Sequence, residues 1–554
     1  MRKIRIAGVL LSLALVAAAC KGGGGGGNNG GGTVEGGILR LGTASSIDSL
    51  NPFKAFNQDA YNAFFYMYPF LVQFDQNLNI VGDFAKDWQF NSDHTGGTFH
   101  TVSGGTWSDG KPLTANDAAY TINLILKYPG PTGLEAGYAK HIASAEATDP
   151  NTLVISYEEP VNESWALAQL ELIPIMPQQV WSQHEGNGGK DLQTFRNDAP
   201  VVCGGPFILT QYQKRDIAQF QVNKGFYGPK PHIDGFGMKF YTSEDAMMTA
   251  FLNGELDAVE GVPPSTLARV KGNPNMAVME TQGMTFDELI TNSNKPLHPE
   301  LLNPQVREAF AHAIDQQQIV DVVQLGHAQV GTSIVAPVAG MWHDPNIKPA
   351  THDMNLANQL LDQLGYTRGS DGIRVANGHP MSYQVLTPDD VTSIGREFEI
   401  LKASLQQIGV KLTQKSLDST TVFDVMAAPD YVYPKDYDKY DLAIWQWTGY
   451  MDPDFILSVL TCQQWGFWND SGYCNTTYDK LYEQQGVTVD QQARKQIVWQ
   501  MQEMIATDRP YIVLDYRNAL PAHTTQWDGF VNSPLGVFNN LSKATMLSVH
   551  RVSS

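Results

Sequence analysis

The stretch KYDLAIWQWTGYMDPDFILSVLTCQQWGFWNDSGYC, residues 439–474, gives the clearest indication of the fold. Within it, residues 441–447 fit a side-chain period of two. This predicts a β-strand, because successive strand side chains point to opposite faces of a sheet. Two indole rings then point the same way. The predicted faces are Ala443, Trp445 and Trp447 on one side and Leu442, Ile444 and Gln446 on the other.

A polar turn follows this strand. Gly449 lets the backbone turn, Asp452 is placed to cap the next segment, and Pro453 starts that segment, which runs over 455–460. An aromatic face leading into a polar turn suits a small-molecule or peptide cleft, because rings bury area at little entropic cost while polar groups set orientation. The alternative is that the tryptophans only pack a core. The expected ligand contacts are Trp447, Gly449, Tyr450, Asp452 and Trp445.

Length and composition indicate a globular protein with more than one domain. The chain has 554 residues, of which 42% are hydrophobic and 17% charged. Acidic residues outnumber basic ones by 57 to 37, which gives a formal charge of −20. Such a surface repels nucleic acid and anionic lipid headgroups, so neither is an expected partner.

The first residues have the pattern of an export signal. A short basic segment precedes the apolar run 6–19, which is shorter than the roughly 20 residues that span a bilayer. Residues 15–20, LVAAAC, resemble the lipobox of bacterial lipoproteins, which predicts a signal peptide over 1–19 and a lipidated Cys20. Ordinary cleavage with an incidental Cys20 is the alternative. Glycines follow the cysteine, so 20–35 is expected to be a flexible tether.

Export also permits disulfides. Cys462 and Cys474 lie close together in the sequence and are expected to form a bridge, which would stabilise the fold by roughly 3 kcal/mol. Cys203 is left over and is expected to be a buried free thiol rather than a reactive one.

The remaining chain alternates short strands and helices. Thr114 with Asp117 has the spacing of a helix capping box, and Asn303 followed by Pro304 predicts another helix start. An aromatic run over 61–74 also has a helical pattern. The other predicted strands are 38–43, 152–157, 207–209, 217–222, 236–241 and 276–281, and the other predicted helices are 357–365, 401–409 and one that Asp315 caps.

Several motifs follow one another along the chain: Leu39–Thr43 with Leu50–Pro52, Trp107–Asp117, Gly204–Phe207, Asn253–Asp257, Leu302–Asp315, Trp447–Gly449 with Asp452–Pro453, and Arg509–Leu514. In this order they resemble the peptide-binding class (family 5) of extracytoplasmic solute-binding proteins of ABC transporters. The resemblance implies an α/β, two-lobed periplasmic-binding-protein-like fold of type II, with hinge strands and an extra domain. It places lobe I at 36–80, 205–295 and 515–554, the extra domain at 81–204, and lobe II at 296–514.

The resemblance also implies a function. The protein would be a lipid-anchored monomer outside the cytoplasm, at the cell membrane, that captures oligopeptides or related solutes and delivers them to a membrane permease with its ATPase subunits. An alternative is a binding or sensor protein for a non-peptide solute such as an oligosaccharide or a metal chelate. A hydrolase is not expected, because the sequence contains neither a nucleophile elbow nor an H-E-x-x-H zinc pair. No cofactor and no metal site are expected.

The sequence departs from the family in one place. Peptide binders of the family commonly have Trp-x-Gly-Asp, in which the aspartate receives the ligand's α-ammonium group, but here the fourth position is Tyr450. A buried ammonium without a carboxylate partner is unfavourable by several kcal/mol. We therefore expect a ligand without a free ammonium at this position: an N-blocked or cyclic peptide, or a solute whose ring stacks on Trp447 and Tyr450.

Overall fold

The computed structural model describes residues 33–133, 135–427, 440–534, 536–538 and 542–553. The predicted signal peptide 1–19, the lipidation site Cys20 and most of the tether therefore lie outside the described residues. Among the helices that are described, none combines the length and apolar character needed to cross a bilayer.

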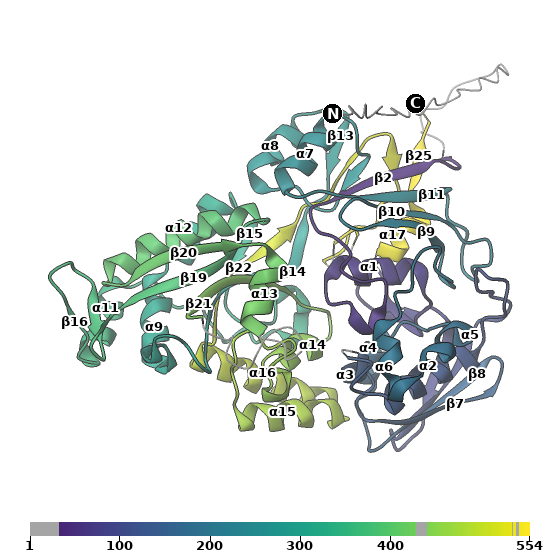
Figure 1. The fold of residues 1–554 in the computed structure, drawn as a ribbon, viewed down its shortest axis with the longest axis horizontal. Coiled ribbons are helices and arrows are strands. Elements are labelled where there is room, and N and C mark those ends of the chain that lie inside the picture. Colours follow the sequence, from purple (N-terminus) through teal and green to yellow (C-terminus); the bar gives the residue numbers. More distant parts are fainter. Residues whose placement is uncertain (1–32, 134, 428–439, 535, 539–541, 554) are drawn as a thin grey trace, which may run out of the picture.

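The first lobe is built on a seven-stranded sheet, at the upper right of Figure 1. Its central strands are parallel, and its edges are antiparallel. In spatial order the strands are β13 (Met276–Val278), β23 (Ala522–Thr524), β12 (Ala258–Val259), β2 (Ile38–Thr43), β11 (Gly235–Phe240), β10 (Ile217–Val222) and β9 (Phe207–Gln213). Its helices are α1 (Gln58–Met67), α7 (Glu244–Leu252), α8 (Pro264–Lys271) and α17 (Ser542–Ser548).

The extra domain contains a four-stranded antiparallel sheet below the first lobe (Figure 1). The strand order is β5 (Ala85–Phe90), β6 (Gly96–Thr101), β8 (Thr152–Tyr157) and β7 (Ile142–Asp149). Helix α2 (Ala115–Lys127) packs against β7, and the predicted capping box of Thr114 and Asp117 is present. A second helix of this domain, α4 (Glu163–Leu170), faces the other lobe.

The second lobe is built on a mixed six-stranded sheet, at the left of Figure 1. The strand order is β15 (Ala328–Val330), β22 (Tyr511–Ala519), β14 (Thr281–Thr291), β21 (Leu442–Thr448), β19 (Ser382–Pro388) and β20 (Lys411–Leu417). The main helices are α9 (Pro304–Ala313), α11 (Met354–Gln363), α12 (Thr392–Gln407), α13 (Ser419–Ala427), α14 (Asp454–Val459), α15 (Thr476–Val487) and α16 (Gln491–Asp508). This is the two-lobed α/β fold with an extra domain that was predicted.

Two long antiparallel strands, β14 and β22, connect the two large sheets. The chain leaves the first sheet after β13 and enters the second with β14, and it returns from β22 to β23. The crossings therefore lie at 279–280 and 520–521. The predicted boundary at 295 instead assigns all of β14 to lobe I, and the predicted boundary at 514 lies inside β22. Both boundaries follow the family's sequence segments rather than the pairing of the strands.

Strand β21 separates two cores, as its alternation predicts. Ala443 and Trp447 pack in the core beneath α13, α14 and α16, whereas Leu442 and Ile444 pack in the core formed with α9 and α12. Each face of the strand packs against a different core. A shift of one residue in its register would therefore exchange the two sets of side chains.

The helix predicted over 61–74 is wrong in its second half. Helix α1 ends at Met67, its C-cap Tyr68 has extended backbone angles, and Val72–Phe74 forms strand β3. The physical reason is Pro69, since the residue before a proline is sterically excluded from the helical region.

Candidate functional site

A cavity of about 690 Å³ lies between the two lobes, where strands of both sheets end. The parallel strands β2, β11 and β12 of the first lobe and β19, β20 and β21 of the second direct their carboxyl ends toward it. The last residues of these strands and the loops after them supply its walls: 43–46, 240–242, 260–261, 389–391, 418–420 and 445–448. Open α/β sheets bind ligands at such carboxyl ends.

Aromatic side chains form much of the wall of this cavity. Trp445, Trp447 and Tyr450, three of the expected ligand contacts, line it, and Trp447 also donates its indole N–H to buried Asp470 at 3.0 Å. This hydrogen bond fixes the orientation of the ring. The remaining aromatic residues of the wall are Phe56, Tyr61, Tyr138, Phe240, Tyr241, Phe423, Phe455 and Trp468.

Gly449 and Asp452 lie differently from the three aromatic candidates. Gly449 is buried behind the wall, where its N–H donates to the Met284 carbonyl at 3.2 Å. Asp452 is only 8% exposed and is not part of the wall. It accepts two hydrogen bonds of 2.6 Å from fully buried Arg494. This placement counts against Asp452 as a ligand contact.

The capping role predicted for Asp452 is met only in part. Its carboxylate accepts a hydrogen bond from the N–H of Asp454, the first residue of α14, at 3.0 Å. The N-cap position itself is occupied by Pro453, which makes no side-chain cap. The main partner of the Asp452 carboxylate is therefore the Arg494 guanidinium, which the sequence pattern did not indicate.

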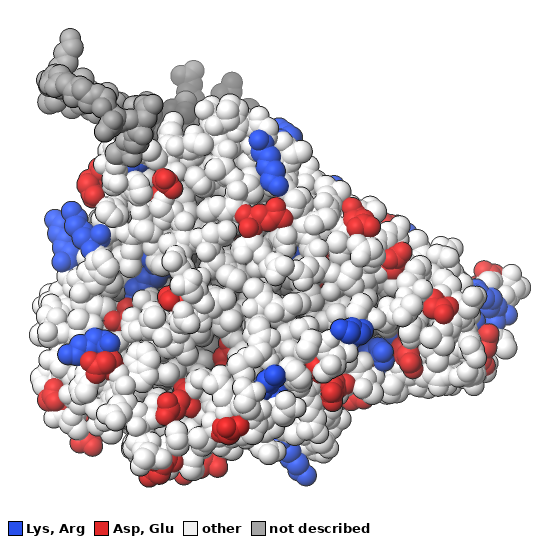
Figure 2. Space-filling view, turned by 180° about the vertical axis from the view of Figure 1, so that it is seen from behind, with Lys and Arg blue, Asp and Glu red and all other residues white. Residues whose placement is uncertain are grey.

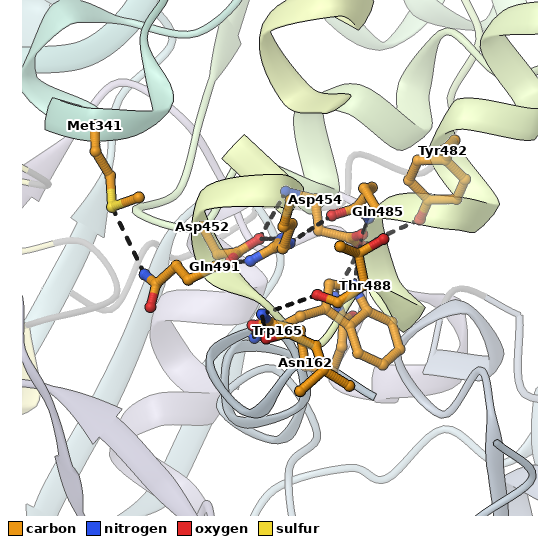
Figure 3. Close-up of polar contacts among 12 residues, drawn as sticks. Asn162, Trp165, Met341, Asp452, Asp454, Tyr482, Gln485, Thr488 and Gln491 are labelled. Carbon is orange, nitrogen blue, oxygen red and sulfur yellow. Dashed lines mark hydrogen bonds and ion pairs between the residues drawn. The ribbon is translucent and has the colours of Figure 1, made fainter. Parts of the chain in front are cut away.

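Asp454 joins the second lobe to the extra domain, and sequence reasoning missed this role. Its carboxylate accepts hydrogen bonds from the Trp165 indole at 2.7 Å and from the Gln169 amide at 2.8 Å, both on α4. Figure 3 shows Trp165 and Asn162 approaching Asp454 and Thr488 of the second lobe. Burial raises the pKa of Asp454. No local signal marks this contact, because the partners are 289 positions apart.

Charged residues in the cavity wall are mostly acidic. The carboxylates are Glu244, Glu260, Asp389, Asp390 and Asp418, and the cations are Arg215 and Arg517. The Arg517 guanidinium is already paired with buried Asp287 and donates to Gln446 at 2.7 Å. The wall therefore carries a surplus of negative charge. On the face of the molecule in Figure 2, acidic and basic side chains are scattered among uncharged ones, without a broad basic patch.

Among the described residues, one buried group of carboxylates has the spacing of metal ligands: Asp287, Glu397 and Asp515, whose oxygens lie within 4.8 Å of one another. The Arg517 guanidinium donates to Asp287, and the Gln324 amide lies 3.0 to 3.4 Å from all three carboxylates. These groups satisfy only part of the cluster, since Glu397 Oε2 and Asp515 Oδ1 have no hydrogen-bond partner among the described residues. The Arg517 guanidinium offsets part of the negative charge, which favours a structural role over a metal site.

The predicted disulfide is present between Cys462 and Cys474, whose Cα atoms are 4.4 Å apart. It closes the loop that carries Trp465 and Trp468. Cys203 is a free, buried thiol, and burial raises its pKa to about 12. It is therefore held in the unreactive thiol form.

A sequence model described as "Bacterial extracellular solute-binding proteins, family 5 Middle" matches residues 79–467. The chain belongs to this family. As a family 5 protein it is a solute-binding component of an ABC transporter, acts outside the cytoplasm and is not an enzyme.

Relatives of known sequence and similar structures cover nearly the whole chain. "Protein XP55" of Streptomyces lividans is 25% identical over 510 residues, 91% of this chain and 88% of its own length. The ABC transporter-associated periplasmic binding protein DppA from Helicobacter pylori, in complex with peptide STSA, has 22% identity and a TM-score of 0.79, covering 94% of this chain and 99% of its own. NikZ from Campylobacter jejuni, in complex with Ni(L-His), has 20% identity and a TM-score of 0.82, covering 93% and 99%.

Proposed function

We propose that this family 5 protein is anchored to the membrane through a lipid on Cys20 and captures a peptide or peptide-like solute in the cavity between its lobes. The observation that carries the proposal is the cavity itself. Its volume of about 690 Å³ and its mixture of aromatic and polar walls are typical of sites for small ligands. Delivery to a membrane permease, driven by ATPase subunits, would follow closure of the lobes around the solute.

The ligand's amino terminus is not expected to be held as in other peptide binders. Tyr450 stands where those proteins have an aspartate, and the next carboxylate, Asp452, is bound to Arg494 outside the wall. A peptide with a blocked amino terminus, a cyclic peptide, or a ring-bearing solute stacked on Trp447 and Tyr450 fits this arrangement. The similar protein NikZ is in complex with Ni(L-His), so non-peptide solutes belong in the same test.

Native mass spectrometry of protein purified under non-denaturing conditions tests the proposal. A bound mass corresponding to a peptide or peptide-like solute is expected, and it should be lost when Trp447 is replaced by alanine. Calorimetry with matched free and N-acetylated peptides then tests the end group. Acetylation should change affinity little, whereas a loss of more than about 2 kcal/mol, the scale of a charge-assisted hydrogen bond, would contradict the inference.

A further inference from the structure

Two acidic side chains meet where the large cavity joins a smaller one of about 380 Å³. Asp59 lies in the first turn of α1 and lines the smaller cavity, whereas Glu260 follows β12 directly and lines both. Thr43, at the end of the neighbouring strand β2, lies between them. All three belong to the first lobe, across the cavity from Trp447 and Tyr450.

These carboxyl groups have few partners within the protein. Asp59 is 2% exposed and accepts a hydrogen bond from the Thr43 hydroxyl at 3.2 Å, and Ser45 also lowers its pKa through a side-chain hydrogen bond. The Oε1 atom of Glu260 is buried and has no hydrogen-bond partner in the part of the chain that the structure describes. No lysine, arginine or histidine within that part forms an ion pair with either group. Burial raises the pKa of both, and Asp59 raises that of Glu260 further.

Two adjacent carboxyl groups, Asp59 buried and Glu260 half-buried, cannot both stay ionised at low cost without a compensating cation, and in its absence protonation relieves the repulsion. The protein supplies none from the neighbouring walls. Arg517 is committed to Asp287, and the other arginines that line the two cavities, Arg215 and Arg396, are exposed. A cation brought by the ligand would let both groups ionise and would balance their charge.

The remaining wall favours an organic cation over a hydrated metal ion. Tyr61 of the first lobe and Tyr138 of the extra domain line one side of the large cavity, and the tryptophans of β21 in the second lobe also line it. Aromatic faces attract ammonium and guanidinium groups through their quadrupoles. Carboxylates combined with aromatic rings therefore match the two parts of a cationic organic group.

We propose that Asp59 and Glu260 form a subsite for a positively charged organic group of the solute, an ammonium or a guanidinium. The inference rests on the proposed function and names the class of solute. The charge of the ligand would be recognised on the first lobe rather than at the position of Tyr450 in the second. In a blocked or cyclic peptide, this group would be a lysine-like or arginine-like side chain.

Two pools of N-acetylated tripeptide amides test the inference. One pool carries lysine at the central position, the other carries uncharged norleucine, and the outer positions are the same mixture of alanine, leucine, phenylalanine and tyrosine in both. Native mass spectrometry ranks the members, and calorimetry compares the tightest binder with its norleucine counterpart. The lysine peptide should bind about 10- to 100-fold more tightly, the range for a charge-assisted hydrogen bond.

Three variants separate binding at the subsite from general electrostatic attraction by the other acidic residues. Glu260→Gln, and independently Asp59→Asn, should reduce the preference for lysine to within about threefold, since a neutral amide no longer balances the charge. Glu255→Gln, at an exposed carboxylate of the first lobe that lines neither cavity, should keep the preference. Thermal unfolding without peptide shows whether each variant is folded. If Glu260→Gln does not fold, the binding preference of Asp59→Asn decides the test.

The outcomes distinguish this inference from the proposed function. If both pools bind equally to the native protein, the protein binds peptides but the cationic subsite is wrong. Retention of the full preference for lysine in folded Glu260→Gln would overturn the subsite in the same way. If neither pool binds, the peptide-binding function fails, and the subsite fails with it.

Discussion

Removal of the Asp452 carboxylate should destabilise the second lobe without weakening ligand binding. Asp452 and Arg494 form a buried ion pair with two hydrogen bonds of 2.6 Å, and Arg494 is fully buried beside Gln485 and Trp342. Asp452→Ala leaves the guanidinium buried with only the Gln485 amide oxygen as acceptor. Breaking one partner of such a pair costs about 3–5 kcal/mol of unfolding free energy.

A double-variant cycle measures the interaction free energy between Asp452 and Arg494, separately from the effect of each substitution alone. Asp452→Asn and Arg494→Met each remove one charge, and the double variant removes both while roughly keeping volume. Because a buried ion pair is often replaced by apolar groups with little net loss, the double variant should be more stable than the sum of the single effects predicts, by about 1–3 kcal/mol. Urea unfolding gives the stabilities, and calorimetry with the copurified solute gives the affinities.

Weaker binding with unchanged stability would contradict a purely structural role for Asp452. If Asp452→Asn weakened binding more than about tenfold while leaving the unfolding free energy unchanged, Asp452 would be a ligand contact of the kind the family uses. Glu399→Gln, on the exposed face of α12 beside Lys402, serves as the control and should change neither quantity.

Three further predictions concern the anchor, the cysteines and pH. The mature protein should fractionate with membranes and carry acyl mass on Cys20, and native protein free in the medium with an unmodified N-terminus would contradict this. Non-reducing peptide mapping should recover Cys462 linked to Cys474 and Cys203 as a free thiol, whereas a peptide linking Cys203 to either would contradict it. Burial raises the pKa of Glu171 to about 8, so its stabilising contribution is full below the unfolded pKa of about 4.5 and is lost as pH rises toward 8. Glu171→Gln should therefore raise the melting temperature relative to the native protein more at pH 8 than at pH 5, and equal differences at both would count against it.

Local chemistry in the sequence was sufficient for many elements and for part of the site. The capping box at Thr114, the Pro304 helix start and the alternation in β21 depend on neighbouring residues, so they could be recognised without a structure. The same alternation predicted that Trp445 and Trp447 face one way. The end of α1 at Met67 could also have been predicted, because Pro69 sterically excludes the residue before it from the helical region.

Long-range pairing decided the parts that could not be predicted. Asp452 meets Arg494 42 positions later, and Asp454 meets Trp165 from another domain. A carboxylate in a sequence gives no indication of whether its partner will be a backbone N–H, an arginine or a ligand. Glu260 was likewise invisible as a cavity residue, because its role depends on β12 lying beside β2.

Small-angle scattering with and without the copurified solute tests most directly whether the solute is captured between the lobes. The radius of gyration should be smaller with the solute. The melting temperature should be higher, because a ligand that binds only the folded state adds about 2.7 kcal/mol at a hundredfold excess over its Kd. An unchanged radius and an unchanged melting temperature, with the copurified solute and across broad peptide, sugar and nickel–histidine pools, would contradict capture between the lobes.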